Sequence, residues 1–255
     1  MEIKTKTFLV SGGAGGLGLA TAQMLIKELG NVVLLDINSE IGVQRQNLLG
    51  DQALFCKVDV TEETSILTAI DLAKRKFGNI HGLINCAGIG TAKRVLGKEN
   101  VFPLDDFQKV ININLSGSFN TLRLVANEVQ YNIPNEWGER GVIINTASVA
   151  AYEGQIGQAA YSASKGGIVS MTLPIARELA RFGIRVMTIA PGLFETPMMN
   201  TLSAEAKASL ESQIPFPARL GKPSEFAMLV KQIIENPMLN GEVIRLDGGM
   251  RMKEK

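Results

Sequence analysis

The sequence predicts an α/β fold: a single doubly wound domain in which helices cover both faces of a seven-stranded parallel sheet. Short apolar runs alternate with longer segments of helical periodicity along the whole chain, as in repeated βαβ units. The runs are continuously apolar, which is typical of parallel strands buried on both faces. Because no internal repeat or Pro/Gly/Ser-rich linker divides residues 1–255, we expect one domain.

The individual elements follow from these patterns in chain order. The apolar runs predict strands at residues 8–10, 32–35, 53–58, 83–84, 142–145, 184–190 and 243–246. Helical periodicity predicts helices at residues 17–29, 64–77, 104–129, 161–182 and 224–234. Residues 89–103 and 131–141 lack clear periodicity, and the second segment contains a proline and turn formers, so we expect two surface loops.

Composition and charge argue against several kinds of partner. The 26 Lys and Arg residues nearly balance the 25 Asp and Glu residues, for a net charge of +1, so no nucleic-acid partner is expected. The chain contains no apolar run of about 18 residues, so no membrane partner is expected either. Residues 1–6 lead directly into the first predicted strand and leave no room for a targeting leader, so we expect a cytoplasmic location.

The cysteine and histidine content limits the chemistry that the chain can perform. Cys56 and Cys86 can form neither a disulfide framework nor a CxxC pair, which fits a reducing compartment. His81 is the only histidine, so no histidine cluster is available and no metal site is expected. A Ser-His-Asp triad would have to use His81, but the apolar neighbours of this residue favour a structural role.

A glycine-rich segment lies between the first predicted strand and the first predicted helix. Backbone N–H groups and the positive end of a helix meet at such a turn, which makes it a site for a pyrophosphate. Glycine is needed where a Cβ would hold the phosphate away from the backbone. A tight turn without a ligand is the alternative. The candidate cofactor-binding residues in this segment are Gly12, Gly15, Gly16, Leu17 and Gly18.

Asp36 ends the second predicted strand, roughly 20 residues after the glycine turn, where a ribose-binding carboxylate is expected. A carboxylate accepts hydrogen bonds from the adenosine ribose of NAD, but it would repel the 2′-phosphate of NADP by about 1–4 kcal/mol. Neither the glycine turn nor Ile37 and Asn38 supplies a cation to offset this repulsion, so the sequence favours NAD as the cofactor. A helix cap or a solvated acid is the alternative for Asp36.

The ends of the third and fourth predicted strands carry further candidate cofactor contacts. Asp59 and Val60 follow the third strand, where they could contact adenine, although a turn or cap role for Asp59 is equally ordinary. Cys86, Ala87 and Gly88 follow the fourth strand, where small residues allow the backbone to approach a flat cofactor.

Tyr161 and Lys165 lie four residues apart at the start of a predicted helix, so their polar groups can converge on one face. A neighbouring ammonium favours the phenolate and lowers the pKa of the phenol toward the working range of a general base. The alternative for Tyr161 and Lys165 is a partly exposed helix face without a catalytic role. However, Ser148 lies at the end of the fifth predicted strand, where ligands bind and where its hydroxyl can hold a carbonyl or alcohol oxygen. These residues are therefore the candidate catalytic set, with Ser148 and Tyr161 as the candidate substrate contacts.

Together these motifs resemble the short-chain dehydrogenases/reductases over essentially the whole chain. The resemblance rests on the glycine turn, Asp36, Asp59, residues 85–88, Asn114, Ser148, Tyr161 with Lys165, and Pro191 with Gly192. Ser11 and Cys86 depart from the commoner Thr and Asn of the family.

The resemblance implies a Rossmann fold and a role for each matched residue. Tyr161 would be the general acid/base, Lys165 would lower its pKa and bind the nicotinamide ribose, and Ser148 would orient the substrate oxygen. Asn114 would hold a water that relays protons from Lys165. Further cofactor contacts are implied at Pro191, Phe194 and Thr196.

Within the family, residues 141–151, 153–168, 185–194 and 240–248 resemble the dehydrogenases of 3-hydroxyacyl-CoA thioesters and 17β-hydroxysteroids, as do the loops 89–103 and 131–141. This similarity implies hydride transfer between NAD and (S)-3-hydroxyacyl-CoA, with hydroxysteroids as further substrates, and a homotetrameric assembly. The alternatives are another NAD-linked alcohol dehydrogenase, a 3-oxoacyl carrier-protein reductase, and an NAD-binding scaffold without catalysis.

Two segments are candidates for binding the substrate outside the catalytic set. Residues 193–216 are apolar enough to cover an acyl chain or a steroid, although a surface helix packed on the core is the alternative. Loop 89–103 carries cations that could meet the phosphates of coenzyme A, although a solvated loop is the ordinary interpretation. The residues concerned are Phe194, Met198, Met199, Leu202, Leu210, Ile214 and Phe216 in the first segment, and Lys93, Arg94 and Lys98 in the second.

Overall fold

The computed structural model describes residues 1–98, 100–196 and 210–254. Its strands are β1 (Thr7–Ser11), β2 (Asn31–Asp36), β3 (Ala53–Lys57), β4 (Gly82–Asn85), β5 (Gly141–Thr146), β6 (Ile184–Pro191) and β7 (Val243–Leu246). Its α-helices are α1 (Gly16–Lys27), α2 (Ser39–Leu49), α3 (Glu63–Phe77), α4 (Leu104–Ile111), α5 (Gly117–Val129), α6 (Ala159–Ala180) and α8 (Pro223–Glu235). A π-helical turn spans Asn112–Ser116, and a 3-10 turn spans Val149–Ala151.

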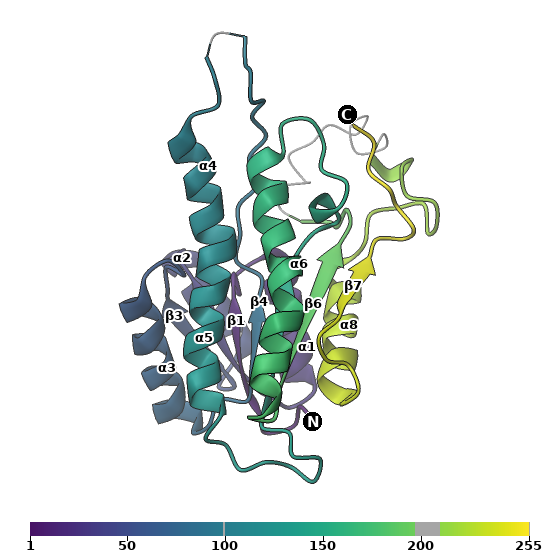
Figure 1. The fold of residues 1–255 in the computed structure, drawn as a ribbon. Helices are drawn as coiled ribbons and strands as arrows, with labels where there is room; N and C mark the ends of the chain where they lie inside the picture. The colour runs from purple at the N-terminus through teal and green to yellow at the C-terminus, as the bar shows by residue number, and fades with distance from the viewer. Residues whose placement is uncertain (99, 197–209, 255) are drawn as a thin grey trace.

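The strands form one parallel sheet in the order β3-β2-β1-β4-β5-β6-β7 (Figure 1). The doubly wound, seven-stranded α/β fold expected from the sequence is therefore confirmed. The chain runs outward from β1 to β3 and then returns to place β4 on the other side of β1. Such a reversal of strand order opens a crevice beyond the carboxyl ends of the strands, and ligands of open α/β sheets bind there.

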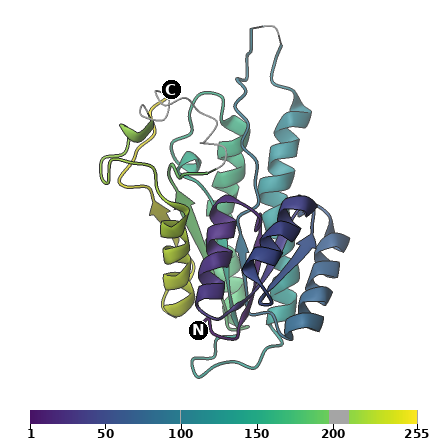
Figure 2. The same ribbon diagram turned by 180° about the vertical axis from the view of Figure 1, so that it is seen from behind.

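Helices cover both faces of the sheet because both faces are apolar. One core joins β-strand side chains to α3, α5 and α6, with fully buried Ile66 and Val125 as examples. The other joins the opposite face to α1 and α8, with fully buried Leu25 and Phe226 (Figure 2). Strands buried on both faces explain why the sequence shows continuous apolar runs rather than alternation.

The structure corrects the expected elements in three places. The predicted helix 104–129 runs without a break in the chain, but a π-helical turn at Asn112–Ser116 separates α4 from α5. Helix α2 was not predicted, because Gly42 is its only buried residue and its sequence therefore lacks an apolar stripe. The expected loop 131–141 is one residue too long, since Gly141 opens β5.

The two ends of the sheet differ in what they carry (Figures 1 and 2). Residues 89–98 and 100–103, the end of the described chain and the loop after β5 all lie beyond the carboxyl ends of the strands. The segment that joins α5 to β5 lies at the opposite end, near the N-terminus. The fold therefore places only the first of the two irregular loops near the predicted site.

His81 has a structural contact just before β4. Its Nδ1 accepts a hydrogen bond from the backbone nitrogen of Thr7 at 3.2 Å, and burial lowers its pKa to about 4. A neutral imidazole fixed between two strands fits the structural role expected for it. Among the residues that the structure describes, no helix is both long and apolar enough to cross a bilayer.

Candidate active site

The glycine turn after β1 packs tightly against the segment that follows β4. Gly12 has φ of +63°, and a Cβ there would lie 2.9 Å from the backbone nitrogen of Ala87. Gly18 lies directly under Gly12, because a Cβ on Gly18 would lie 2.2 Å from the Gly12 carbonyl oxygen. The sequence therefore needs glycine at both positions simply to form this turn.

The turn also leaves room for an anion. Helix α1 begins at Gly16 with no side-chain cap on its N-terminus and no acidic residue in its first turn. A Cβ on Gly15 would meet nothing within 4 Å, so the backbone is open to solvent there. Free N–H groups at the positive end of a helix, beside an accessible backbone, fit the pyrophosphate of a dinucleotide.

Asp36 is placed against this turn, as its position in the sequence predicts. Its Oδ2 accepts a hydrogen bond from the backbone nitrogen of Ala14 at 3.1 Å, and its Oδ1 accepts one from Asn38 at 3.1 Å. Asn38, and not Asp36, caps helix α2, since its side chain accepts from the backbone nitrogen of Ile41. The partly buried Asp36 carboxylate thus lies at the edge of the glycine turn, where an adenosine ribose would lie.

Further cofactor-binding candidates lie at the ends of β3 and β4. The Asp59 carboxylate accepts hydrogen bonds from the backbone and hydroxyl of Thr61, at 2.9 and 2.7 Å, which is the turn role left open by the sequence. Val60 is buried against Gly117. Burial raises the pKa of Cys86 to about 11, so its thiol is uncharged at neutral pH.

Ser148 and Tyr161 are brought together beyond the end of β5. Ser148 precedes the 3-10 turn, and its Oγ accepts a hydrogen bond from the backbone nitrogen of Ala150 at 3.1 Å. Burial raises the pKa of Tyr161, and a hydrogen bond with the Ser148 hydroxyl acts in the opposite direction. The two hydroxyl groups therefore form one pair that can hold the same substrate oxygen.

Lys165 lies one helical turn beyond Tyr161 and is buried. Its Nζ donates a hydrogen bond to the carbonyl of Thr146 at 2.7 Å and lies 5.8 Å from the centre of the Tyr161 ring. Burial lowers the pKa of Lys165 to about 8. A buried ammonium so close to the phenol is the electrostatic arrangement that the Tyr-x-x-x-Lys spacing predicts.

Asn114 is buried in the π-helical turn, and its side chain binds the backbone of the segment that follows β4. Its side-chain amide exchanges two hydrogen bonds with the backbone of Ile89, at 2.8 and 2.9 Å, and donates a third to Ser164 at 3.1 Å. Gly88 permits this approach, since a Cβ there would lie 3.2 Å from the Asn114 side-chain oxygen and 3.6 Å from Lys165 Nζ. Asn114 therefore lies beside Lys165, and its water-holding role stays a prediction.

Only part of the predicted substrate segment 193–216 lies within the described residues; Met198, Met199 and Leu202 lie outside them. Pro191 ends β6, Phe194 is 6% exposed and packs on Gly221, and Thr196 is partly buried. Ile214 is buried, whereas Phe216 is 83% exposed.

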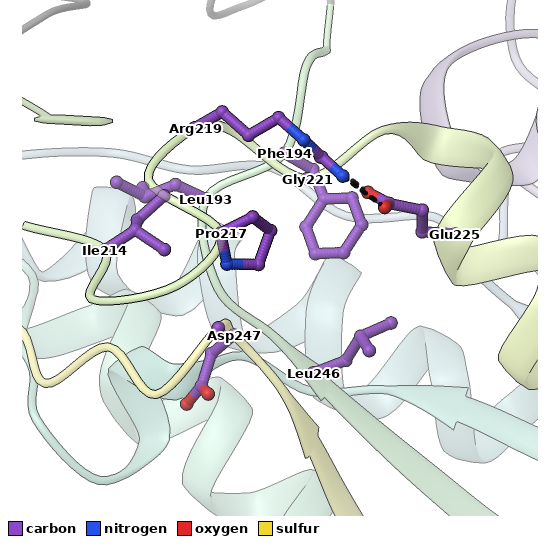
Figure 3. A pocket seen from close by; sticks show the side chains of 10 residues that line it. Leu193, Phe194, Ile214, Pro217, Arg219, Gly221, Glu225, Leu246 and Asp247 are labelled. Carbon is purple, nitrogen blue, oxygen red and sulfur yellow. Dashed lines mark hydrogen bonds and ion pairs between the residues drawn. The ribbon is translucent and has the colours of Figure 1, made fainter.

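A cavity of about 130 Å³ lies under the described part of this segment, between the ends of β6 and β7 (Figure 3). Leu193, Ile214 and Pro217 form much of its lining, and the ion pair between Arg219 and Glu225 lies at its edge. Neither Ser148 nor Tyr161 lines it, so this cavity adjoins the candidate site but is not the site of the chemistry.

Sequence reasoning missed the backbone groups that orient the polar side chains. The Thr146 carbonyl holds Lys165, and the Ile89 backbone holds Asn114. A backbone carbonyl or N–H is present at almost every position, so residue identity gives no signal for these contacts. The hydrogen bond from Asn114 to Ser164 could have been suspected from the sequence, because Ser164 lies within the Tyr161–Lys165 motif.

The chain is similar to known proteins over nearly its whole length. The family model for the short chain dehydrogenases matches residues 6–207. The protein named 3-hydroxyacyl-CoA dehydrogenase type-2 in Homo sapiens is 56% identical over 254 residues, covering 99% of this chain and 97% of that protein. The protein of the same name in Drosophila melanogaster is 54% identical, covering 98% of this chain and 99% of that protein.

Two solved structures show the same fold over nearly the whole chain. The crystal structure of 3-hydroxyacyl-CoA dehydrogenase type-2 from Mycobacterium avium has a TM-score of 0.95 at 42% identity, covering 98% of each chain. The 3-ketoacyl-(acyl-carrier-protein) reductase from Brucella melitensis, complexed with NADH, has a TM-score of 0.86 at 28% identity, covering 98% of this chain and 100% of that one.

Fold and site thus define an oxidoreductase of the Rossmann type, and the resemblance noted in the sequence is confirmed. The chain belongs to the short-chain dehydrogenase family.

Proposed function

We propose that this protein is an NAD-dependent dehydrogenase that interconverts (S)-3-hydroxyacyl-CoA and 3-oxoacyl-CoA thioesters, with hydroxysteroids as a further substrate class. The observation that carries the chemistry is the Ser148–Tyr161 hydroxyl pair with buried Lys165 beside it. The relatives named 3-hydroxyacyl-CoA dehydrogenase type-2, at 54–56% identity over nearly the full length, support the thioester substrate.

The proposed cofactor site is formed by the glycine turn, the N-terminus of α1, Asp36 and the residues that follow β4 and β6. The open backbone at Gly15 and the uncapped start of α1 are the observations that fit a dinucleotide. When bound, NAD supplies the hydride acceptor, and NADH the donor, at the nicotinamide ring.

The chain's own residues move the proton. In alcohol oxidation, the Tyr161 phenolate removes the hydroxyl proton while the Ser148 hydroxyl holds the same oxygen. In ketone reduction, the Tyr161 phenol returns the proton to the oxygen. The Lys165 ammonium favours the phenolate, as does the positive charge of NAD+, and both act against the burial that raises the pKa of Tyr161.

The function is tested by following NADH absorbance with acetoacetyl-CoA, beside a hydroxysteroid with NAD+ and a parallel reaction with NADPH. Rapid NADH oxidation by acetoacetyl-CoA, with little use of NADPH, is the expected result. Activity on the steroid alone would favour another NAD-linked alcohol dehydrogenase, and activity only with NADPH would favour a carrier-protein reductase. Binding of NADH without turnover of any of these substrates would favour the scaffold.

Replacing Asp36 with Asn is expected to weaken the preference for NADH over NADPH by about tenfold or more. The change removes the charge that repels the 2′-phosphate, worth about 1–4 kcal/mol, and about 1.4 kcal/mol corresponds to tenfold. The measurement is the ratio of kcat/KM for the two cofactors. Asp51→Asn, at an exposed turn, is the matched control and should leave the ratio unchanged. An unchanged ratio in Asp36→Asn would refute the assignment of this carboxylate to the ribose.

The cations of loop 89–103 support a coenzyme A contact at two of the three predicted positions. Lys93, Arg94 and Lys98 are all exposed, but Lys93 is already paired with the Asp106 carboxylate. The double variant Arg94→Glu/Lys98→Glu is expected to raise KM for acetoacetyl-CoA about 3- to 30-fold, because each reversed charge removes an attraction of up to about 1 kcal/mol.

The matched substrate for this test is acetoacetyl-N-acetylcysteamine, which keeps the thioester but lacks the phosphates, and its KM should not change. Arg75→Glu on α3 is the control for an exposed charge reversal. An equal rise in KM for both thioesters would rule out phosphate recognition by this loop.

We also infer a homotetramer, by analogy with the family. Exposed apolar side chains on α4, α5 and α6 support an assembly through these helices; they are Leu104, Phe119 and Leu173, at 66%, 47% and 43% exposure. Light scattering after size-exclusion chromatography measures the assembly directly. The cytoplasmic location stays a prediction.

A further inference from the structure

One loop connects the two hydroxyl groups that hold the substrate oxygen. It begins at Ser148, passes through the 3-10 turn, and reaches Tyr161 near the start of α6. On its inner side, Gly154 packs directly on the residue after Tyr161: a Cβ on Gly154 would lie 2.1 Å from Ser162 Oγ. A shift of this loop would therefore change the position of Ser148 relative to Tyr161.

An ion pair fastens the outer side of the loop to β7. Glu153 accepts two hydrogen bonds from the Arg245 guanidinium, at 2.7 and 3.0 Å, in a bidentate arrangement. Arg245 is itself held by Asp247 at 2.7 Å, and its guanidinium lies over the Tyr152 ring at 5.2 Å. The Glu153 and Arg245 side chains are 23% and 22% exposed, so solvent reaches both only in part.

The same two residues hold a short segment of chain, residues 250–254, which we call the strap. The Met252 backbone nitrogen donates to Glu153 at 3.3 Å, and Arg245 donates to the carbonyl of Met250 at 3.0 Å.

The strap in turn holds the next part of the loop. The carbonyl of Glu254 accepts a hydrogen bond from the backbone nitrogen of Ile156 at 3.0 Å, and the carbonyl of Lys253 accepts one from the Gln155 side chain at 3.3 Å. Strap and loop therefore run alongside each other, with Glu153 and Arg245 at their junction.

We propose that Glu153 and Arg245 are positioning residues, which act through the Ser148–Tyr161 loop and the strap to keep the two hydroxyl groups aligned on the substrate oxygen. This proposal rests on the proposed function of that pair.

A positioning role and a purely stabilising role predict different effects when the Glu153–Arg245 pair is lost. The bidentate geometry and the link to Asp247 make this pair more stabilising than a lone surface pair, so its loss should lower the melting temperature as well as the rate. Misplacing a reacting group by about 1 Å can lower a rate by as much as about 100-fold. At a temperature at which the variants are fully folded, a fall in kcat therefore reports the positioning role and not the loss of stability.

The test compares Glu153→Gln and Arg245→Met with Glu128→Gln. Glu128 pairs with Lys74 at 2.6 Å and is 24% exposed, so this control removes a carboxylate of similar burial, from an ion pair between α3 and α5 whose lysine is 51% exposed. Glu153→Gln and Arg245→Met, which we call the loop variants because both loosen the Ser148–Tyr161 loop, are expected to lower kcat with acetoacetyl-CoA by roughly 10- to 100-fold. The dissociation constant of NADH should stay close to that of the unmodified protein, and circular dichroism should show both variants to be folded at the assay temperature. The control should keep its kcat.

The pH profile provides a readout that a merely structural role would not move. The Ser148 hydrogen bond lowers the pKa of Tyr161, so loosening it raises that pKa. Because alcohol oxidation requires the phenolate, the rising limb of kcat/KM for 3-hydroxybutyryl-CoA should move to higher pH in both loop variants. The other titratable groups close to this centre, Lys165 and Cys86, are unchanged in these variants.

The outcomes separate the two proposals. If the unmodified protein turns over acetoacetyl-CoA but the loop variants keep its kcat and pH profile, the positioning role is wrong and the proposed function stands. A fall in kcat that merely matches a fall in the folded fraction also overturns the positioning role. If the unmodified protein does not turn over the thioester, the proposed function itself fails.

Discussion

Tyr161→Phe should lower kcat for acetoacetyl-CoA reduction by about 10²–10⁴-fold while leaving NADH binding nearly intact. The change removes only the phenolic oxygen, and a positioned general acid or base contributes a factor of this size. The ring stays beside Lys165, so the shape of the site is preserved. Steady-state kinetics and titration of NADH fluorescence measure the two effects separately.

The matched control is Tyr131→Phe, which makes the same chemical change on a side chain that is 78% exposed. It should behave like the unmodified protein. If Tyr161→Phe retained more than about half of the normal kcat, another group would have to transfer the proton. Tyr161 would then not be the general acid/base.

Gly18→Ala is the second substitution with a large expected effect, and it acts on cofactor binding rather than on chemistry. The added Cβ would lie 2.2 Å from the Gly12 carbonyl oxygen, which belongs to the backbone and cannot rotate away. Overpacking of this kind costs about 1–3 kcal/mol, so the glycine turn must move and the dissociation constant of NADH should rise about 10- to 100-fold.

Gly15→Ala is the control from the same turn. Gly15 has φ of −152°, which any residue adopts, and a Cβ there meets nothing within 4 Å. NADH binding in this variant should stay within a few-fold of normal. Equal weakening by both substitutions would contradict the steric account, as would unchanged binding in Gly18→Ala.

The fold was predictable because its strands are buried on both faces. All seven apolar runs form strands. The glycine turn and Ser148 both follow the carboxyl ends of parallel strands, as expected for this topology. Helix α2 was not predictable from periodicity, since it lies on the surface and buries only Gly42. The π-helical turn at Asn112–Ser116 was also hidden, because one extra residue in a helical turn hardly changes an apolar pattern.

The candidate site was predictable where side chains carry the chemistry and not where backbone groups orient them. The sequence indicated Tyr161 and Lys165 by their spacing of four residues, and Ser148 by its position at the end of a strand. The structure brings these three residues together. The Thr146 carbonyl that holds Lys165 gave no such signal. The Glu153–Arg245 pair gave no signal either, because its two members lie 92 residues apart in the sequence.

Direct hydride transfer to a 3-oxoacyl-CoA, with Tyr161 supplying the proton, is the central claim. It is tested most directly by incubating the protein with acetoacetyl-CoA and NADH that carries deuterium at both C4 positions, followed by mass spectrometry of the product. The predicted result is 3-hydroxybutyryl-CoA that has gained one deuterium at C3, formed at a rate that collapses in Tyr161→Phe. Product without deuterium, or labelled product formed equally fast by Tyr161→Phe, would contradict the claim.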